Sequence, residues 1–344
     1  MATIGGTFQN LIDLYKGTDE NRAVAEVIEA LHTLNPLMQD AYTVECNKGT
    51  SHLTSIRTGL PSVAWGALYS GIPQSKSTVM QVEDTTGFVE GLSSVDKRLL
   101  DLSPNPAATR MMEATSFLEA ISQEVQSSFF YSNSDLTPKK FHGLAARYAK
   151  LPTANEPASN QVVNAGGSGS DNTSIWMCTW GPMQTHLITP KGIPGGIQRE
   201  DKGEQRVTDA SNNPYFVKEE LFTQHVGVAV RDWRYNVRVA NIDVSDMQAG
   251  SVDLYKFLRK AYYKFEGRRN AGKKNGGMVT VGKPVIYCNR DVLEALDALA
   301  TNRGSTDNFV RLQRMEVQGE EVIAYRGIPI RETDAILNTE AALT

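Results

Sequence analysis

The sequence contains few of the residues that build disulfide frameworks or metal sites. Its 344 residues include three cysteines, Cys46, Cys178 and Cys288, which lie far apart. At most one disulfide could form, and we expect reduced, buried thiols. The five histidines are scattered, whereas a zinc site needs several ligands at compatible spacings. We therefore predict no metal site and no Cys/His or Ser/His/Asp catalytic set, although residues distant in sequence can meet in space.

Long apolar runs are also missing. No stretch approaches the roughly 18 apolar residues of a membrane span. The first residues lack the basic start and apolar run of a secretory signal. We therefore expect synthesis in a cytoplasm and no membrane partner.

The charges nearly balance. The chain has 35 basic and 39 acidic residues, a formal net charge of −4. This balance is not that of a protein whose affinity rests on many phosphate contacts, so we do not expect tight general DNA binding. With 40% hydrophobic residues, the chain can bury an ample core, and its length suggests about two domains.

The first 55 or so residues are predicted to form an arm. Thr18–Asn21 supplies helix-start residues, and apolar residues then recur at helical spacing from Val24 to Leu31. Pro36 ends this short amphipathic helix.

From Leu60 to Asp84 the pattern indicates a long hairpin. The small, polar residues Ser70–Lys76 form a turn-like centre, and the β-rich segment Ser77–Val82 follows. Little in this hairpin would pack into the chain's own core, so only a neighbour's surface can bury its apolar face. We predict that this face is formed by Val63, Trp65, Val79 and Val82, and that Lys76 is a further inter-subunit contact.

The clearest helix follows the hairpin. Asn105 can cap it, Pro106 suits its first position, and a helix over 105–130 would be on the order of 37 Å long. Its apolar stripe is predicted to consist of Met111, Ala114, Leu118, Ile121, Val125 and Phe129.

Residues 151–218 are rich in turns. They include one β segment in which Trp176, Cys178 and Trp180 share a side, and a charged stretch, Arg199–Lys202, that we predict to be a solvated turn. The remaining predicted elements are β structure over 225–242, a helix from Ser251 to Gly267, a strand over 284–288, a helix capped by Asn289, and strands over 321–325 and 328–331.

Two glycine-rich motifs resemble nucleotide-binding loops. Gly277–Lys283 satisfies the phosphate-loop pattern until Pro284 replaces the hydroxyl residue that would bind magnesium. Its interior is β-branched and it leads into a strand, so we interpret it as a β-hairpin turn. Gly166–Gly169 matches a dinucleotide loop only in composition, and we interpret it as a surface loop.

One basic run stands out, from Lys256 to Lys274. On the helical part these charges lie opposite Phe257 and Phe265, as on any solvated amphipathic helix. The alternative is a loop that contacts nucleic acid or an acidic neighbour. The candidate contact residues are Arg268, Arg269, Lys273 and Lys274.

The order of these parts resembles the major capsid proteins of tailed bacteriophages with the HK97-like fold, especially those of short-tailed, podovirus-type phages. The stretches that carry the resemblance are Thr54–Trp65, Pro73–Thr78, Gly181–Pro182, Pro190–Gly192, Val230–Tyr235 and Ala240–Val244.

The resemblance implies an α+β fold with a fixed division of the chain. Residues 1–55 would be an N-terminal arm and 56–98 an extended β-hairpin loop that lies over a neighbouring subunit. Residues 99–249 would be a peripheral domain with the spine helix at 105–130 and the β insertion at 151–218. Residues 250–324 would be an axial domain, and 325–344 would return to the peripheral domain as a C-terminal tail.

The implied function is structural. Copies would assemble as hexamers and pentamers into an icosahedral head shell that encloses double-stranded DNA without sequence-specific binding, with a portal, a separate scaffolding protein and a possible decoration protein as partners. The resemblance implies no catalytic residues and no cofactor. We identify no partner for a crosslink through Lys76. The alternatives are an encapsulin-like nanocompartment shell, another virion component, or an α+β nucleotide-binding enzyme, which Gly277–Lys283 would favour.

Overall fold

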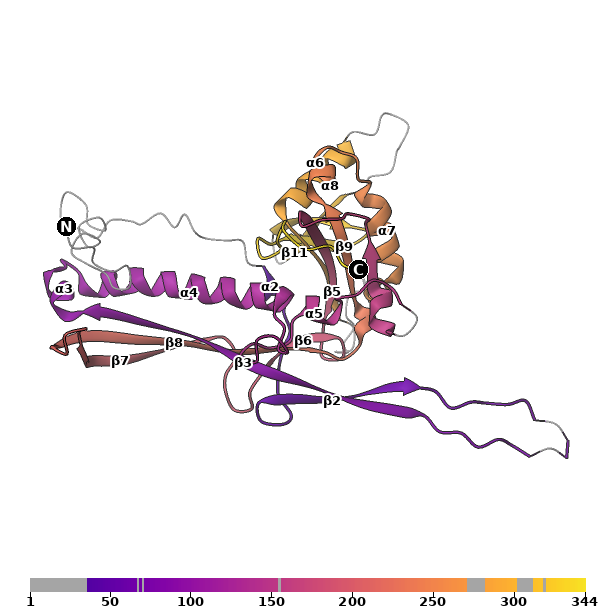
Figure 1. Cartoon of the computed structure of the whole chain (residues 1–344), viewed down its shortest axis with the longest axis horizontal. Helices are drawn as coiled ribbons and strands as arrows, with labels where there is room; N and C mark the ends of the chain where they lie inside the picture. The colour runs from indigo at the N-terminus through magenta and orange to yellow at the C-terminus, as the bar shows by residue number, and fades with distance from the viewer. Residues whose placement is uncertain are drawn as a thin grey trace. The chain divides into compact units, whose positions relative to one another are not determined.

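A computed structural model shows a chain organised as two compact units, which are described here in turn (Figure 1). Within the described residues, unit 1 consists of 88–126 and 194–225, and unit 2 of the remainder. The domain boundaries given above stay predictions. The structure describes residues 36–344 except 67, 70, 154–155, 271–281, 302–311 and 318–319, so the predicted N-terminal helix lies outside the described residues.

Helix α4, Pro106–Tyr131, confirms the predicted 105–130 helix and contributes most of its length to unit 1. Asn105 caps it, because its side-chain oxygen accepts a hydrogen bond from the Ala108 amide at 3.2 Å. Phe117 stacks on Phe222 of β8 with ring centroids 5.8 Å apart. The predicted stripe is only partly correct, since Ala114, Ile121, Val125 and Phe129 are buried but Met111 and Leu118 are exposed.

The strands of unit 1 carry a dense set of ion pairs. Arg110 of α4 pairs with Asp201 and Glu220, and Arg199 pairs with Glu220 at 2.8 Å. The prediction of a turn at Arg199–Lys202 was wrong, because these residues lie inside β7, where partners across the ribbon and on α4 favour an extended strand. The elements that contribute here are β3 (Thr78–Asp96), α3 (Lys97–Leu102), β7 (Ile197–Thr208) and β8 (Pro214–Val230).

Unit 2 is built around β5 (Asn172–Trp180), which is buried along its whole length between β9 and β10. On one face Ile175 and Met177 join a core with helices α7 and α8. On the other face Trp176 and Trp180 pack against Phe129 and Phe130 of α4, which confirms that the tryptophans share a side. A strand that packs on both faces is expected to be apolar throughout.

In unit 2 the structure also confirms β10, β12, β13, α7 and α8, whereas the sequence patterns did not predict β1, β2, β4, β6 and β11. The Asn289 side chain accepts a hydrogen bond from the Asp291 amide at 3.2 Å, as predicted for the start of α8. The strands are β1 (Thr43–Glu45), β2 (Ser51–Gly59), β4 (Val162–Asn164), β6 (Thr185–Thr189), β9 (Asn236–Asp243), β10 (Lys283–Cys288), β11 (Gln313–Val317), β12 (Glu320–Tyr325) and β13 (Ile328–Glu332). The helices are α2 (Leu37–Asp40), α5 (Leu144–Arg147), α6 (Val244–Gln248), α7 (Leu254–Lys264), α8 (Arg290–Thr301) and three 3₁₀ turns, Pro157–Gln161, Trp233–Tyr235 and Glu266–Asn270.

Candidate inter-subunit contact surface

An extended loop, residues 60–77, joins β2 to β3 in unit 2. The two strands pair antiparallel from Ser51 opposite Thr85 to Gly59 opposite Thr78. Beyond the ladder, the hydrogen bond from Ser75 Oγ to the Ser62 carbonyl, at 2.7 Å, joins the two limbs. In Figure 1 the loop runs out from the ends of its strands. It therefore has little of the chain to pack against.

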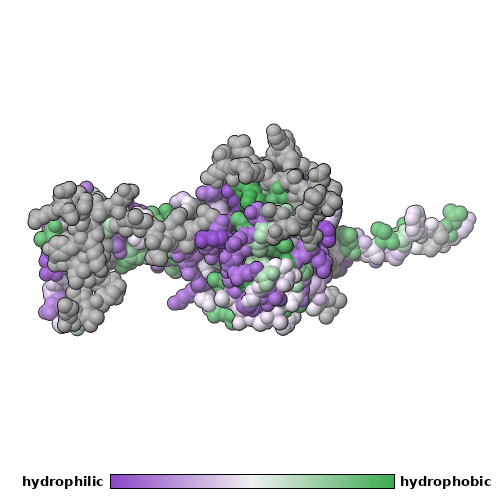
Figure 2. All heavy atoms as spheres, turned by 90° about the horizontal axis from the view of Figure 1, so that it is seen from above, coloured by the Kyte–Doolittle hydropathy of each residue, from purple (hydrophilic) through white to green (hydrophobic). Residues whose placement is uncertain are grey.

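Large apolar side chains recur along this loop (Figure 2). Val63 is 94% exposed and Trp65 is fully exposed, as the hairpin prediction required. Burying one such side chain stabilises a contact by roughly 1.5–3 kcal/mol. Contiguous exposed apolar residues of this kind mark an interaction surface. The sequence interpretation missed four further members, although their apolar character beside turn residues was visible: Leu60, Leu68, Tyr69 and Ile72.

The ladder corrects the predicted apolar face. Val79 lies opposite Arg57, whereas Val82 lies opposite Thr54. Side chains three residues apart on a strand point to opposite faces, so Val79 and Val82 do not share one. Val82 shares its face with the cross-strand pair Ile56 and Met80, of which Met80 is exposed. The error arose because the hairpin's register is set by its pairing and its bulge near Gly59.

The loop has charge of a single sign. Between Glu45 and Glu83 the sequence contains no acidic residue. It contains three basic residues there, Lys48, Arg57 and Lys76. Lys48 pairs with Glu83 at 3.2 Å, at the base of the hairpin. Lys76 is exposed in the limb that returns to β3. The loop is therefore apolar along most of its length, with one cation, Lys76, near the start of β3.

A hollow of about 580 Å³ lies beside the outer edge of β2, within unit 2. Seven consecutive residues, 54–60, line it from β2, and Met183 and residues 231–234 line it from the other side. In the described sheet β2 is the last strand, so this edge carries unpaired backbone groups.

The structure describes only two of the four residues of the predicted basic contact, Arg268 and Arg269. Arg268 donates to the carbonyl oxygens of Tyr263 and Phe265, both at 2.8 Å, so it closes the end of α7. Arg269 is largely exposed and pairs with Glu266 at 3.1 Å. Lys273 and Lys274 lie outside the described residues, as does most of Gly277–Lys283. Lys283 itself pairs with the buried carboxylate of Asp40 at 2.7 Å.

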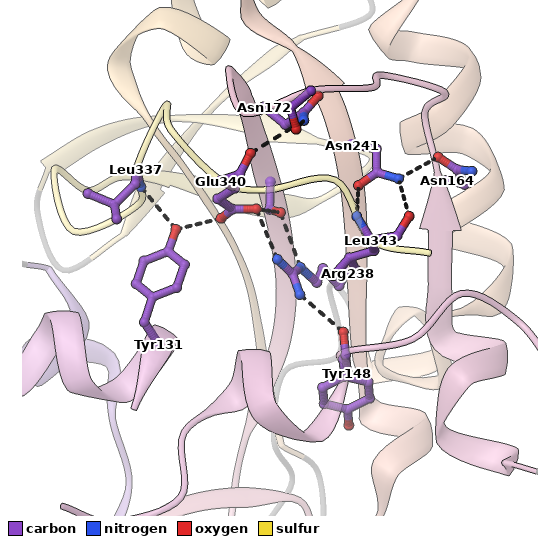
Figure 3. A network of polar contacts seen from close by, with 11 residues as sticks. Tyr131, Tyr148, Asn164, Asn172, Arg238, Asn241, Leu337, Glu340 and Leu343 are labelled. Atoms are coloured by element: carbon purple, nitrogen blue, oxygen red, sulfur yellow. Dashed lines mark hydrogen bonds and ion pairs between the residues drawn. The ribbon is translucent and has the colours of Figure 1, made fainter. Parts of the chain in front are cut away.

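A buried polar network holds the C-terminal segment to unit 2 (Figure 3). Arg238 of β9 pairs with Glu340 at 2.9 Å and donates to the Tyr148 carbonyl at 3.1 Å. Glu340 also accepts hydrogen bonds from Tyr131 and Ser174. Burial, and then the Glu340 charge, raise the pKa of Tyr131, so its phenol stays protonated and donates. The oxygens of Glu340 are all engaged, and the network is structural.

Other site types are not apparent in the part of the chain that the structure describes. There, no three histidine, cysteine, aspartate or glutamate side chains come together as they would around a metal ion. In the same residues no helix combines the length and the apolarity that crossing a bilayer requires.

Comparison with solved structures gives an alignment that covers this chain and the other chain completely. It is to a chain from the cryo-EM structure of bacteriophage Epsilon15, with 31% sequence identity and a TM-score of 0.77. The JBD30 bacteriophage capsid aligns with 97% of this chain and 96% of that chain, at 10% identity and a TM-score of 0.46. The SrpI encapsulin of Synechococcus elongatus PCC 7942 aligns with 64% of this chain and 92% of that chain, at 12% identity and a TM-score of 0.42. No curated protein matches the chain.

A protein-family model also matches the chain. The model described as "Major capsid protein GP7" matches residues 19–344, which is nearly the whole chain. This agrees with the Epsilon15 alignment and with an α+β, HK97-like fold, and it does not favour the nanocompartment or nucleotide-enzyme alternatives. The exposed loop and the apolar residues on it fit a subunit whose role is structural. The chain therefore belongs to the GP7 family of bacteriophage major capsid proteins.

Proposed function

We propose that this capsid subunit builds the head shell of a short-tailed phage around double-stranded DNA and catalyses no reaction. Copies would form hexamers and pentamers in the bacterial cytoplasm, with a portal and a separate scaffolding protein as partners. A decoration protein is a further candidate partner. The observation that carries the proposal is the extended loop, whose large apolar side chains have no cover within the chain's described residues.

We infer that the loop lies on unit 1 of a second copy. The loop carries one cation, Lys76, and no acid, and Arg57 precedes it in β2, whereas residues 88–126 and 194–225 of unit 1 contain 12 acidic and 7 basic residues. Complementary charge steers such a contact and sets its orientation, while apolar burial supplies most of the affinity. A contact between two different surfaces of identical subunits repeats around a ring, and rings of this kind can close into a shell.

Photo-crosslinking from the loop tests this arrangement. We expect Trp65→p-benzoylphenylalanine, activated in assembled shells, to label residues 88–126 or 194–225 of another subunit. Mixing isotope-labelled and unlabelled subunits separates crosslinks between copies from crosslinks within one. The same photoreactive residue at Leu136, an exposed position outside the loop, is the control. Labelling confined to the loop's own subunit would contradict the proposal, and labelling of another copy elsewhere would contradict only the choice of unit 1.

The basic run is proposed to contact the packaged DNA or an acidic neighbour. Arg269 is exposed, and Lys273 and Lys274 follow it in sequence. Because Arg268 closes α7, an Arg269/Lys273/Lys274→Gln variant removes charge without disturbing the helix end. We expect shells of this variant to form normally but to lose packaged DNA more readily as salt rises, since counterion release governs phosphate contacts. Unchanged assembly together with unchanged genome retention would assign these residues to a solvated surface.

A further inference from the structure

The root of the extended loop contains a buried histidine held by an arginine. His52 of β2 and Asp84 of β3 lie directly opposite one another in the ladder, and both are at least 95% buried. Arg231, which follows β8, places Nη2 2.8 Å from His52 Nε2. The ring of His186 on β6 stands edge-on to that of His52, with centroids 5.4 Å apart.

The chemistry of this contact requires a neutral His52. A guanidinium group carries only hydrogen-bond donors, so Nε2 must accept and cannot carry a proton. The neutral ring therefore has its hydrogen on Nδ1. A second proton would turn the acceptor into a donor and would place two cations at hydrogen-bond distance in a buried site. The contact and the protonated ring exclude one another.

The surrounding charges offer little compensation. Asp84 is already engaged by Arg147, at 2.6 Å, and Arg147 also donates to the carbonyl oxygens of His142 and Val228. The other titratable group that faces the site is His186 on β6, whose ring contacts that of His52. The site thus holds two guanidinium groups and one carboxylate, which is paired with Arg147, so a proton on His52 adds to an excess of positive charge.

We propose that protonation of His52 at acid pH expels Arg231 and loosens the root of the extended loop, where β2 and β3 meet the rest of unit 2. Arg231 lines the hollow beside β2, which gives its side chain an open path toward solvent. At neutral pH, the hydrogen bond between His52 and Arg231 thus stabilises the positions of β2 and β3. This step concerns the subunit alone and does not depend on which surface of a neighbour the loop contacts.

The direction of the pH effect follows from the histidines at the root. Burial, and then the Arg231 charge, lower the pKa of His52, while Asp84 opposes the shift. Burial lowers the pKa of His186 to about 4, with Arg231 and His52 adding to the effect. Burial and Arg147 lower the pKa of His142. The unfolded chain therefore takes up these protons first, so stability is full above about pH 6.5 and is lost as pH falls toward the folded-state values.

Hydrogen exchange of the full-length subunit tests the proposal. We compare peptides covering 51–59 and 78–85 at about pH 7.5 and about pH 5, on either side of the ordinary histidine pKa, after correction for intrinsic exchange rates. In the unmodified chain, protection should fall by up to about tenfold for each pH unit below the ordinary histidine pKa, for each histidine whose folded pKa lies below the pH of the measurement. His52→Gln should lose less protection than the unmodified chain, since its amide oxygen can still accept from Arg231 and it cannot take up a proton, and the loss that remains should come from His186 and His142. His225→Gln, which changes a histidine of unit 1, should behave like the unmodified chain.

The outcomes are decisive in either direction. Equal loss of protection in the unmodified chain and in His52→Gln would overturn the proposal. If His52→Gln does not fold, an NMR titration of the unmodified subunit with ¹³C-labelled histidine supplies the test. The pKa of His52 should then lie below its ordinary value and rise in Arg231→Gln. An ordinary or raised pKa in the unmodified subunit would equally overturn the proposal.

Discussion

Replacing Val63 and Trp65 with aspartate is expected to abolish shell assembly and to leave the melting temperature of the free subunit unchanged. Both side chains are at least 94% exposed, so the subunit loses no core contact, and surface changes of this kind usually alter stability by less than about 0.5 kcal/mol. At the contact, two apolar anchors are lost and two carboxylates would have to be buried. A loss of only about 1.4 kcal/mol of binding free energy lowers the affinity of one inter-subunit contact tenfold, and the shell repeats this contact many times.

Assembly can be followed by sedimentation velocity and electron microscopy, and subunit stability by calorimetry. Leu136→Asp is the matched control, because Leu136 is 82% exposed but lies outside the loop. We expect this variant to assemble normally. Shells of normal size and yield from the Val63/Trp65 variant would show that the apolar loop residues do not carry the contact.

Replacing Glu340 with alanine is expected to destabilise the subunit by about 3–5 kcal/mol, because it leaves Arg238 buried without its counter-charge. The Arg238 and Glu340 side chains are 4% and 6% exposed, and Tyr131 and Ser174 lose their acceptor as well. Urea denaturation of the unassembled subunit measures the effect as a lower midpoint.

An exposed ion pair of the same type provides the comparison. Arg290 pairs with Glu332 at 3.0 Å, but the arginine side chain is 68% exposed, so Glu332→Ala should lower stability by less than about 1 kcal/mol. The double change Arg238→Met with Glu340→Leu should recover much of the loss, since it removes both buried charges. If Glu340→Ala and Glu332→Ala lower the stability of the subunit equally, burial does not set the strength of the Arg238–Glu340 pair.

Local patterns predicted the elements that depend on nearby residues. The cap of α4, the shared side of the β5 tryptophans and the start of α8 at Asn289 follow from spacings within a few turns of chain. The exposed loop was also predictable, because polar turn residues and isolated apolar residues occur there together. Arg199–Lys202 was misread because partners on α4 and β8 decide its conformation.

The amino-acid sequence alone determined several elements, among them α4, β5 and α8, the lack of any acid along the extended loop, and the resemblance to phage capsid proteins. Only the tertiary structure decided which face Val82 shares and which charges are buried. Arg231 meets His52 across 179 residues, and Arg238 meets Glu340 across 102. Helical and strand periods reflect neighbours along the chain, whereas these contacts depend on how distant segments pack, which no local spacing encodes.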